Sequence, residues 1–110
     1  LRVVSEHRRG ELGYWVGHAF RGHGYATEAA ARLIAFGFDD LALNRIETAA
    51  IPSNRASTRV MEKCGLKYEG TLRQQIFHWV AFHDVDQFGL LREDFMAIYP
   101  TNQLLDSAIT

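Results

Sequence analysis

Hydrophobic positions along the chain change their spacing several times, and each spacing predicts one element. The run from Leu12 to Phe20 is apolar on both faces of an extended strand, which is typical of a central strand. Apolar residues then recur at helical spacing between Ala26 and Phe38, which predicts a helix. The stretch from Arg45 to Ile51 is interpreted as a second strand, ended by Pro52. This order of elements indicates a right-handed βαβ unit with parallel strands.

The second half of the chain is predicted to hold a well-capped helix and a pair of antiparallel strands. Asn54 is the expected N-cap of the helix, with Ser53 as an alternative, and Gly65 is the expected residue just past its end. Evenly spaced apolar residues predict strands at 67–78 and 83–92. Their link lacks Asn-Gly or Asp-Gly, so we expect a looser turn or longer strands. Residues 1–10 are interpreted as the end of an earlier element and a turn, and residues 93–110 as a surface helix or frayed tail.

Composition limits the classes of protein that the chain can belong to. Its 110 residues suit one small domain, and 47% hydrophobic residues argue against disorder. The net charge of −1 gives no sign of a nucleic-acid partner, and no apolar run approaches the roughly 20 residues of a membrane helix. Cys64 is the only cysteine, which favours a reducing, cytoplasmic setting. The chain starts with Leu1 rather than Met, so we expect a fragment of a longer protein.

A glycine-containing loop, Arg21-Gly22-His23-Gly24-Tyr25-Ala26, lies between the first strand and the first helix. Backbone N–H groups at such a turn and helix N-terminus bind phosphate. A Walker loop would need Gly-Lys-Ser/Thr, whereas this chain has Gly24-Tyr25-Ala26. The dinucleotide fingerprint would place its third glycine at Thr27, and the usual acidic residue at the end of the next strand is missing. The pattern Arg/Gln-x-x-Gly-x-Gly/Ala remains, and Arg21, Gly24 and Ala26 match it.

With this loop, the chain resembles the GNAT superfamily of acetyl-CoA-dependent N-acetyltransferases. The wider matches are GYWVGHAFRGHGYATEA, then Asn54-x-x-Ser57, Glu62-Lys63-Cys64-Gly65-Leu66 and Leu91-Arg92-Glu93-Asp94-Phe95. Together they look like the branch that acetylates the N-termini of ribosomal proteins. The resemblance covers about residues 11–95 and implies an α/β fold, with a GNAT-like mixed sheet in the order β-α-β-α-β-β. Residues 1–110 would then be a single GNAT domain that lacks its N-terminal part.

The resemblance also implies which residues bind acetyl-CoA. Backbone N–H groups from Arg21 to Ala26 (Arg21, Gly22, His23, Gly24, Tyr25 and Ala26), with Thr27, would hold the pyrophosphate. Backbone groups near Val16 and His18 would pair with the pantetheine arm, which lies where the two parallel strands splay apart. Asn54 matches the family's pantetheine-contacting asparagine, although an asparagine can also cap a helix with no ligand present.

The implied chemistry is direct attack of a primary amine on the thioester, which needs a base and an acid. Ser57 falls where the ribosomal branch is proposed to have its acid, while the tyrosine usual elsewhere in the superfamily is replaced by Met61. Ser57 could equally be an ordinary first-turn serine. The glutamate proposed as base in that branch would fall at Ile76, so the resemblance gives no base there. Glu11 matches a position that serves as base in other members of the superfamily, and it is the base that the resemblance implies. Glu11 could also be a solvated carboxylate, and the weaker alternatives are an ordered water or the side chains His78, His83 and Asp84.

Three functions remain open at this stage. The first is acetylation of a protein N-terminal amine, and the second is acetylation of a small amine such as a polyamine or an aminoglycoside. The third is a CoA-binding module without catalysis. A metal site is not expected, because the histidine pairs lack ligand spacing and no Cys/His cluster accompanies them. A homodimer is a further possible partner arrangement.

Overall fold

The computed structural model describes residues 1–15 and 23–98, and for residues 13–15 and 23–26 it describes the backbone alone. Five strands form one mixed sheet in the order β1-β2-β3-β5-β4. The strands are β1 (Arg2–Val4), β2 (Arg9–Trp15), β3 (Arg45–Ala50), β4 (Lys67–His78) and β5 (Ala81–Leu91). Strands β2 and β3 run parallel, and the other neighbours are antiparallel. The predicted α/β class with a mixed sheet is therefore confirmed.

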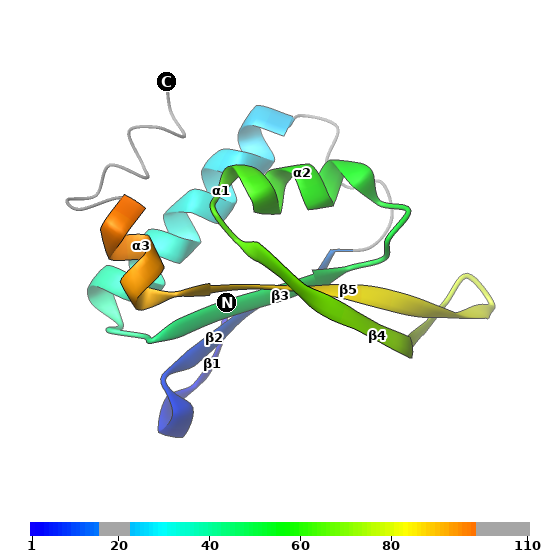
Figure 1. Ribbon diagram of the computed structural model, residues 1–110, viewed down its shortest axis with the longest axis horizontal. Helices are drawn as coiled ribbons and strands as arrows, with labels where there is room; N and C mark the ends of the chain where they lie inside the picture. The colour runs from blue at the N-terminus through cyan, green and yellow to red at the C-terminus, as the bar shows by residue number, and fades with distance from the viewer. Residues whose placement is uncertain (16–22, 99–110) are drawn as a thin grey trace.

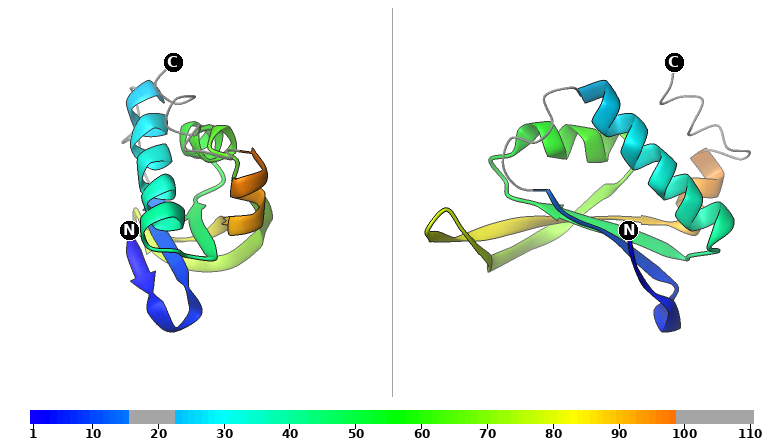
Figure 2. Two further views of the ribbon diagram at one scale, coloured as in Figure 1. Left: turned by 90° about the vertical axis from the view of Figure 1, so that its left-hand side faces the viewer. Right: turned by 180° about the vertical axis from the view of Figure 1, so that it is seen from behind.

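Three helices cover one face of this sheet: α1 (His23–Ala35), α2 (Arg55–Lys63) and α3 (Arg92–Ile98) (Figures 1 and 2). A π-helical turn, η2 (Phe36–Asp40), extends α1, and a 3₁₀ turn, η1 (Ser5–His7), joins β1 to β2. Apolar side chains from the helices and from β3 and β5 form the core between the two layers. Within residues 1–15 and 23–98, no helix lies over the opposite face of the sheet (Figure 2).

Two N-terminal boundaries differ from the sequence-based prediction. Strand β2 begins at Arg9, because residues 2–4 pair with residues 9–11 as an antiparallel hairpin that extends the strand backwards. Residues 16–20 of the expected strand lie outside the described residues. Helix α1 begins at His23 rather than Ala26, so the last residues of the glycine loop belong to the first helical turn.

The second predicted helix is confirmed at both ends. The Ser57 N–H donates to Asn54 Oδ1 over 3.3 Å, which identifies Asn54 as the N-cap. At the other end Gly65 has φ +92°, and the N–H groups of Gly65 and Leu66 donate to the carbonyls of Glu62 and Met61. This is a Schellman motif, in which glycine adopts the left-handed conformation without a steric penalty.

The β4–β5 hairpin follows the second of the two expected forms, that of longer strands. Strand β5 begins at Ala81, and only Trp79 and Val80 lie between the strands. Both turn residues have positive φ, 52° and 58°, as a tight I′-like turn requires. The tip projects beyond the helical layer (Figure 1). Exposed apolar side chains gather there, namely Phe77, Trp79, Val80 and Phe82.

Of the two alternatives for the C-terminal segment, a surface helix or a frayed tail, the structure shows a helix over Arg92–Ile98, and one buried ring attaches it to the body of the protein. Phe95 is fully buried and stacks on Phe38, with 4.8 Å between ring centroids. Residues 99–110 lie outside the described residues. None of the helices within the described residues has the length and apolar character needed to cross a bilayer.

Candidate active site

The site begins where the parallel strands β2 and β3 end. Trp15 and Ala50 are partners at the carboxyl ends of these strands. Each strand leads along the chain to a helix, β2 to α1 and β3 to α2. The register between the strands shifts between Glu11 and Tyr14, where β2 has one residue more than β3. Such a bulge bends a strand and interrupts its pairing, so backbone groups become available to a ligand.

The sequence-predicted acetyl-CoA residues divide into two groups. Val16, His18, Arg21 and Gly22 lie outside the described residues. The backbone of His23, Gly24, Tyr25 and Ala26 forms the first turn of α1, and Thr27 follows in the same helix. N–H groups in a first helical turn have no intrahelical acceptor, and the helix dipole adds positive potential there. This end of α1 is therefore suited to an anion.

Asn54 and Ser57 lie together at the start of α2. Asn54 Oδ1 accepts the Ser57 N–H and so holds the first helical turn in place. The Ser57 side chain is completely buried, and its Oγ has no hydrogen-bond partner among the described residues. Burying a hydroxyl without a partner costs about 1–3 kcal/mol. An unpaired buried hydroxyl is unusual, because most buried polar side-chain atoms have a hydrogen-bond partner.

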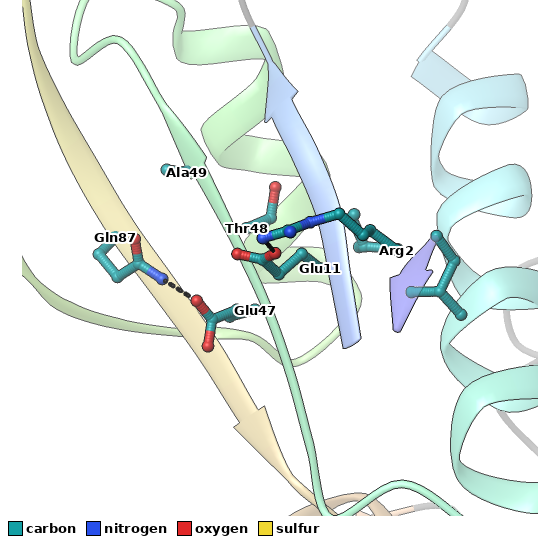
Figure 3. A pocket seen from close by; sticks show the side chains of 8 residues that line it. Arg2, Glu11, Glu47, Thr48, Ala49 and Gln87 are labelled. Atoms are coloured by element: carbon teal, nitrogen blue, oxygen red, sulfur yellow. Dashed lines mark hydrogen bonds and ion pairs between the residues drawn. The ribbon is translucent and has the colours of Figure 1, made fainter. Parts of the chain in front are cut away.

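Glu11 lines a pocket of about 490 Å³ whose charged and polar side chains come mainly from β1, β2, β3 and β5 (Figure 3). The other lining residues are Leu1, Arg2, Leu12, Glu47, Thr48, Ala49 and Gln87. Arg2 forms an ion pair with Glu11 from the neighbouring strand. Ser57 and Asn54 are not among the lining residues, so the structure does not bring both predicted catalytic residues into this pocket.

Charged groups next to Glu11 form a network that the sequence analysis missed. Arg45 donates to both carboxylate oxygens of Glu69, over 2.9 and 2.6 Å, and its Nε donates to Glu47 over 2.9 Å. Gln87 donates to the other oxygen of Glu47 over 3.3 Å (Figure 3). The only signal in the sequence is a pair of charged residues, Arg45 and Glu47, at alternate positions of a strand that is otherwise uncharged.

Gly89 makes room for this network. A Cβ at this position would lie 2.6 Å from a carboxylate oxygen of Glu69 and 2.7 Å from Nη1 of Arg45. The Arg45–Glu69 pair therefore lies directly over the glycine. The Glu69 carboxylate raises the pKa of Arg45, against the lowering effect of burial, and Glu47 raises it further. In turn, Arg45 lowers the pKa of Glu69.

The weaker base candidates lie elsewhere. His78 and His83 belong to the ends of β4 and β5 next to the hairpin tip, where His83 Nε2 donates to the His78 carbonyl over 2.7 Å. Asp84 accepts the Gln74 N–H over 2.8 Å. None of the three lines the pocket around Glu11. Within residues 1–15 and 23–98 there is no group of three side chains suited to holding a metal ion.

The fold belongs to the class of mixed α/β proteins, with three helices on one face of a five-stranded sheet, and comparison with known proteins names the family. The family model described as "Acetyltransferase (GNAT) domain" matches residues 1–67. The chain belongs to this family, and the predicted resemblance is confirmed.

Individual relatives agree with this assignment. An N-acetyltransferase of Bacillus licheniformis named p20 is 37% identical over 93 residues, which are 84% of this chain and 52% of the relative. The solved ribosomal-protein-S5-alanine acetyltransferase of Vibrio fischeri is 27% identical with a TM-score of 0.65, over 68% of this chain and 41% of its own. A spermidine N-acetyltransferase chimera of Vibrio cholerae SpeG and hSSAT is 25% identical with a TM-score of 0.66. The match covers 70% of this chain and 46% of the chimera. The chain spans about half the length of the curated relatives it matches.

Proposed function

We propose that this chain carries the acetyl-CoA side of an N-acetyltransferase that acetylates a primary amine by direct attack. The observation that carries the proposal is the Ser57 hydroxyl, which is fully buried and has no partner among the described residues. A donor that the fold leaves unsatisfied is available to a ligand group. The residues present thus fit acetyl-CoA, whose sulfur needs a proton donor when the thioester breaks.

Acetyl-CoA binding is assigned to the end of the sheet where the two parallel strands, β2 and β3, are followed by helices. The pyrophosphate would be held through backbone N–H groups of the loop residues Arg21 and Gly22 and of the residues at the start of α1, namely His23, Gly24, Tyr25, Ala26 and Thr27. Backbone groups near Val16 and His18 would pair with the pantetheine arm beyond the β2 bulge. Asn54 would contact the same arm while it caps α2. The bulge in β2 supports this placement, because it leaves one residue of β2 without a partner on β3 before the pairing resumes at Tyr14 and Trp15.

Two side chains are assigned to proton transfer. Acetyl-CoA, when bound, supplies the thioester carbonyl that the amine attacks. Glu11 takes the proton that the acceptor ammonium must lose before its nitrogen can form the new C–N bond. Ser57 Oγ–H gives its proton to the sulfur as the C–S bond breaks, and solvent restores the hydroxyl proton. Because Glu11 and Ser57 do not share the pocket, the acceptor would approach from the Glu11 side and the thiol would leave on the Ser57 side.

A protein N-terminal amine, of the ribosomal-protein type, is the preferred acceptor. The likeness to the ribosomal-protein-S5-alanine acetyltransferase supports this choice. The likeness to the spermidine N-acetyltransferase chimera favours a small amine such as a polyamine as the second candidate, and an aminoglycoside belongs to the same class. The third candidate is a non-catalytic CoA-binding module. The proposal also includes a cytoplasmic location, a single GNAT domain that continues beyond this chain, and a homodimer.

A thiol-release assay against a panel of amines tests the proposal. The panel contains N-terminal peptides, polyamines and aminoglycosides, and acetyl-CoA affinity is measured separately by calorimetry. Gly24→Val should abolish acetyl-CoA binding, because a side chain there blocks the close backbone approach to phosphate. Ser57→Ala should preserve binding and lower turnover. A full-length protein that binds acetyl-CoA but acetylates no acceptor would refute the transferase proposal in favour of the binding module.

A further inference from the structure

Charged residues form a row across three neighbouring strands on the side of the sheet that faces away from α1, α2 and α3. Arg2 of β1 is the register partner of Glu11 of β2, and Glu11 is the register partner of Glu47 of β3. All three residues line the same pocket (Figure 3). Like charges directly opposite each other on adjacent strands are destabilising. The carboxylates of Glu11 and Glu47 therefore need nearby cations to offset their mutual repulsion.

The two carboxylates are held in very different ways. Glu47 is held by three side chains of neighbouring strand positions. Arg45 Nε donates to Glu47 Oε1 over 2.9 Å, and Gln87 Nε2 donates to Glu47 Oε2 over 3.3 Å. Arg9 Nε lies 3.5 Å from Glu47 Oε1. Arg45 is itself anchored by Glu69 over Gly89. Only 18% of the Glu47 side chain is exposed. Glu47 is thus a rigid part of the pocket wall.

Glu11, by contrast, depends on a loosely held cation. Within the described residues its ion-pair partner is Arg2, which comes from the three-residue edge strand β1. The Arg2 side chain is 74% exposed, whereas that of Glu11 is 25% exposed. An ion pair with one exposed partner contributes about 0–1 kcal/mol, because water solvates the arginine nearly as well when it leaves. Arg2 can therefore be displaced from Glu11 at little cost.

We propose that the Arg2 guanidinium occupies the place of the acceptor's cationic amine, so that Arg2 and the acceptor compete for Glu11. This inference rests on the proposed function and specifies its acceptor site. Once Arg2 has left, the pocket presents Glu11 beside Glu47, an environment that suits a primary ammonium. Leu1, Leu12 and Ala49 supply apolar lining, so the ammonium would be carried on an aliphatic stem. Displacement also brings the ammonium into contact with the base that must deprotonate it.

The competition makes a clear kinetic prediction. Arg2→Met removes the competing charge and keeps an unbranched stem. We expect KM for a cationic acceptor to fall about threefold to fivefold, the equivalent of an exposed ion pair, with kcat unchanged. Arg2→Lys keeps a competing cation and should keep the KM of the unchanged chain. Arg73→Met is the matched control, because Arg73 is an exposed arginine of β4 that does not line the pocket.

A binding measurement without acetyl-CoA separates this inference from the proposed function. The side-chain carboxyl carbons of Glu11 and Glu47 are followed by NMR while n-butylammonium is added, with n-butanol as the neutral control. A saturable shift is expected with n-butylammonium alone, with threefold to fivefold tighter binding in Arg2→Met and none in Glu11→Gln. A 1,4-diamine and an N-terminal peptide serve as further arms that identify the source of the ammonium.

The outcomes are distinguishable. Equal n-butylammonium affinity in Arg2→Met and the unchanged chain would overturn the inference, whether or not the protein acetylates an amine. The absence of a saturable shift at Glu11 would do the same. If ammonium binds with the expected competition but no acceptor is turned over, the acceptor site stands and the proposed transferase activity fails.

Discussion

Asn54 and Ser57 are joined by a hydrogen bond that uses the backbone of Ser57 and leaves its hydroxyl unused. Ser57 N–H donates to Asn54 Oδ1 over 3.3 Å, and Ser57 Oγ has no partner among the described residues. One residue therefore stabilises the helix end, and the other places a polar group in a buried position. The two residues should respond differently to substitution, which allows capping and catalysis to be measured separately.

Ser57→Ala should lower turnover without loss of stability. The proposed proton donor to the leaving thiolate is removed, and general acid catalysis contributes about 10²–10⁴-fold. Removing a buried, unpaired hydroxyl should keep or slightly raise the free energy of unfolding. Single-turnover kinetics and urea unfolding measure the two quantities. A large drop in stability with little change in the rate of acetyl transfer would contradict the role of Ser57.

Asn54→Ala should lower the free energy of unfolding by about 1 kcal/mol, the usual effect of losing an N-cap. In a domain of this size, that loss corresponds to a fall in Tm of about 4–8 °C. Asn54→Asp is the matched control, since a carboxylate caps equally well and interacts favourably with the helix dipole. Thermal unfolding measures the Tm of the unchanged chain, Asn54→Ala and Asn54→Asp. If Asn54→Asp lowers the Tm as much as Asn54→Ala does, loss of the capping hydrogen bond does not explain the loss of stability.

Acid should destabilise the protein partly through Glu69. Arg45 lowers the pKa of Glu69 in the folded protein below its ordinary value of 4.5, so the unfolded chain takes up the proton first as the pH falls. The stabilising contribution is complete above that ordinary value and is lost as the pH falls through the folded pKa. Urea unfolding between pH 3 and pH 7 should show a shallower loss of stability in Glu69→Gln. Glu62→Gln, on an exposed position of α2, should keep the slope of the unchanged chain.

Cys64 should react slowly with thiol reagents in the folded protein. Burial raises the pKa of the thiol to about 11, and Sγ donates to the Thr27 carbonyl over 3.7 Å. The reactive thiolate is therefore scarce at pH 8, and an ordinary cysteine has a pKa near 8.5. We expect Cys64 in the folded protein to be labelled at least about 100-fold more slowly than in the urea-unfolded chain. The reaction with a disulfide reagent is measured by absorbance. Equal rates in the two states would mean that Cys64 is not buried.

Local signals in the sequence explain which parts of the fold could be predicted. The ends of α2 follow from Asn54 and Gly65, because a cap depends on residues within one turn of the helix. The parallel pairing of β2 and β3 follows from the order of strand, helix and strand. The start of α1 could not be placed in the same way, since residues 23–26 suit both a glycine loop and a first helical turn.

The pocket could be predicted only in part, because most of its contacts join residues that are far apart in the sequence. Glu11 was expected to belong to the site on resemblance alone, and the structure does place it in a pocket. The partners of Arg45 and Glu47 could not be inferred, because Glu69 lies 24 positions after Arg45 and Gln87 lies 40 positions after Glu47. Such contacts depend on the strand order, in which β5 lies between β3 and β4. No local pattern in the sequence reports that order.

The hairpin tip offers the clearest case of local strain. Trp79 and Val80 both have positive φ, a conformation that costs a β-branched residue such as Val about 1–3 kcal/mol. Trp79→Asn combined with Val80→Gly supplies the residues that this turn prefers, so the free energy of unfolding should rise by about 1 kcal/mol. Val80→Thr is the control, because it removes an exposed apolar side chain but keeps the branched Cβ. A gain in Tm for Val80→Thr equal to that of the double variant would show that exposed apolar surface, rather than the backbone conformation, is what destabilises the tip.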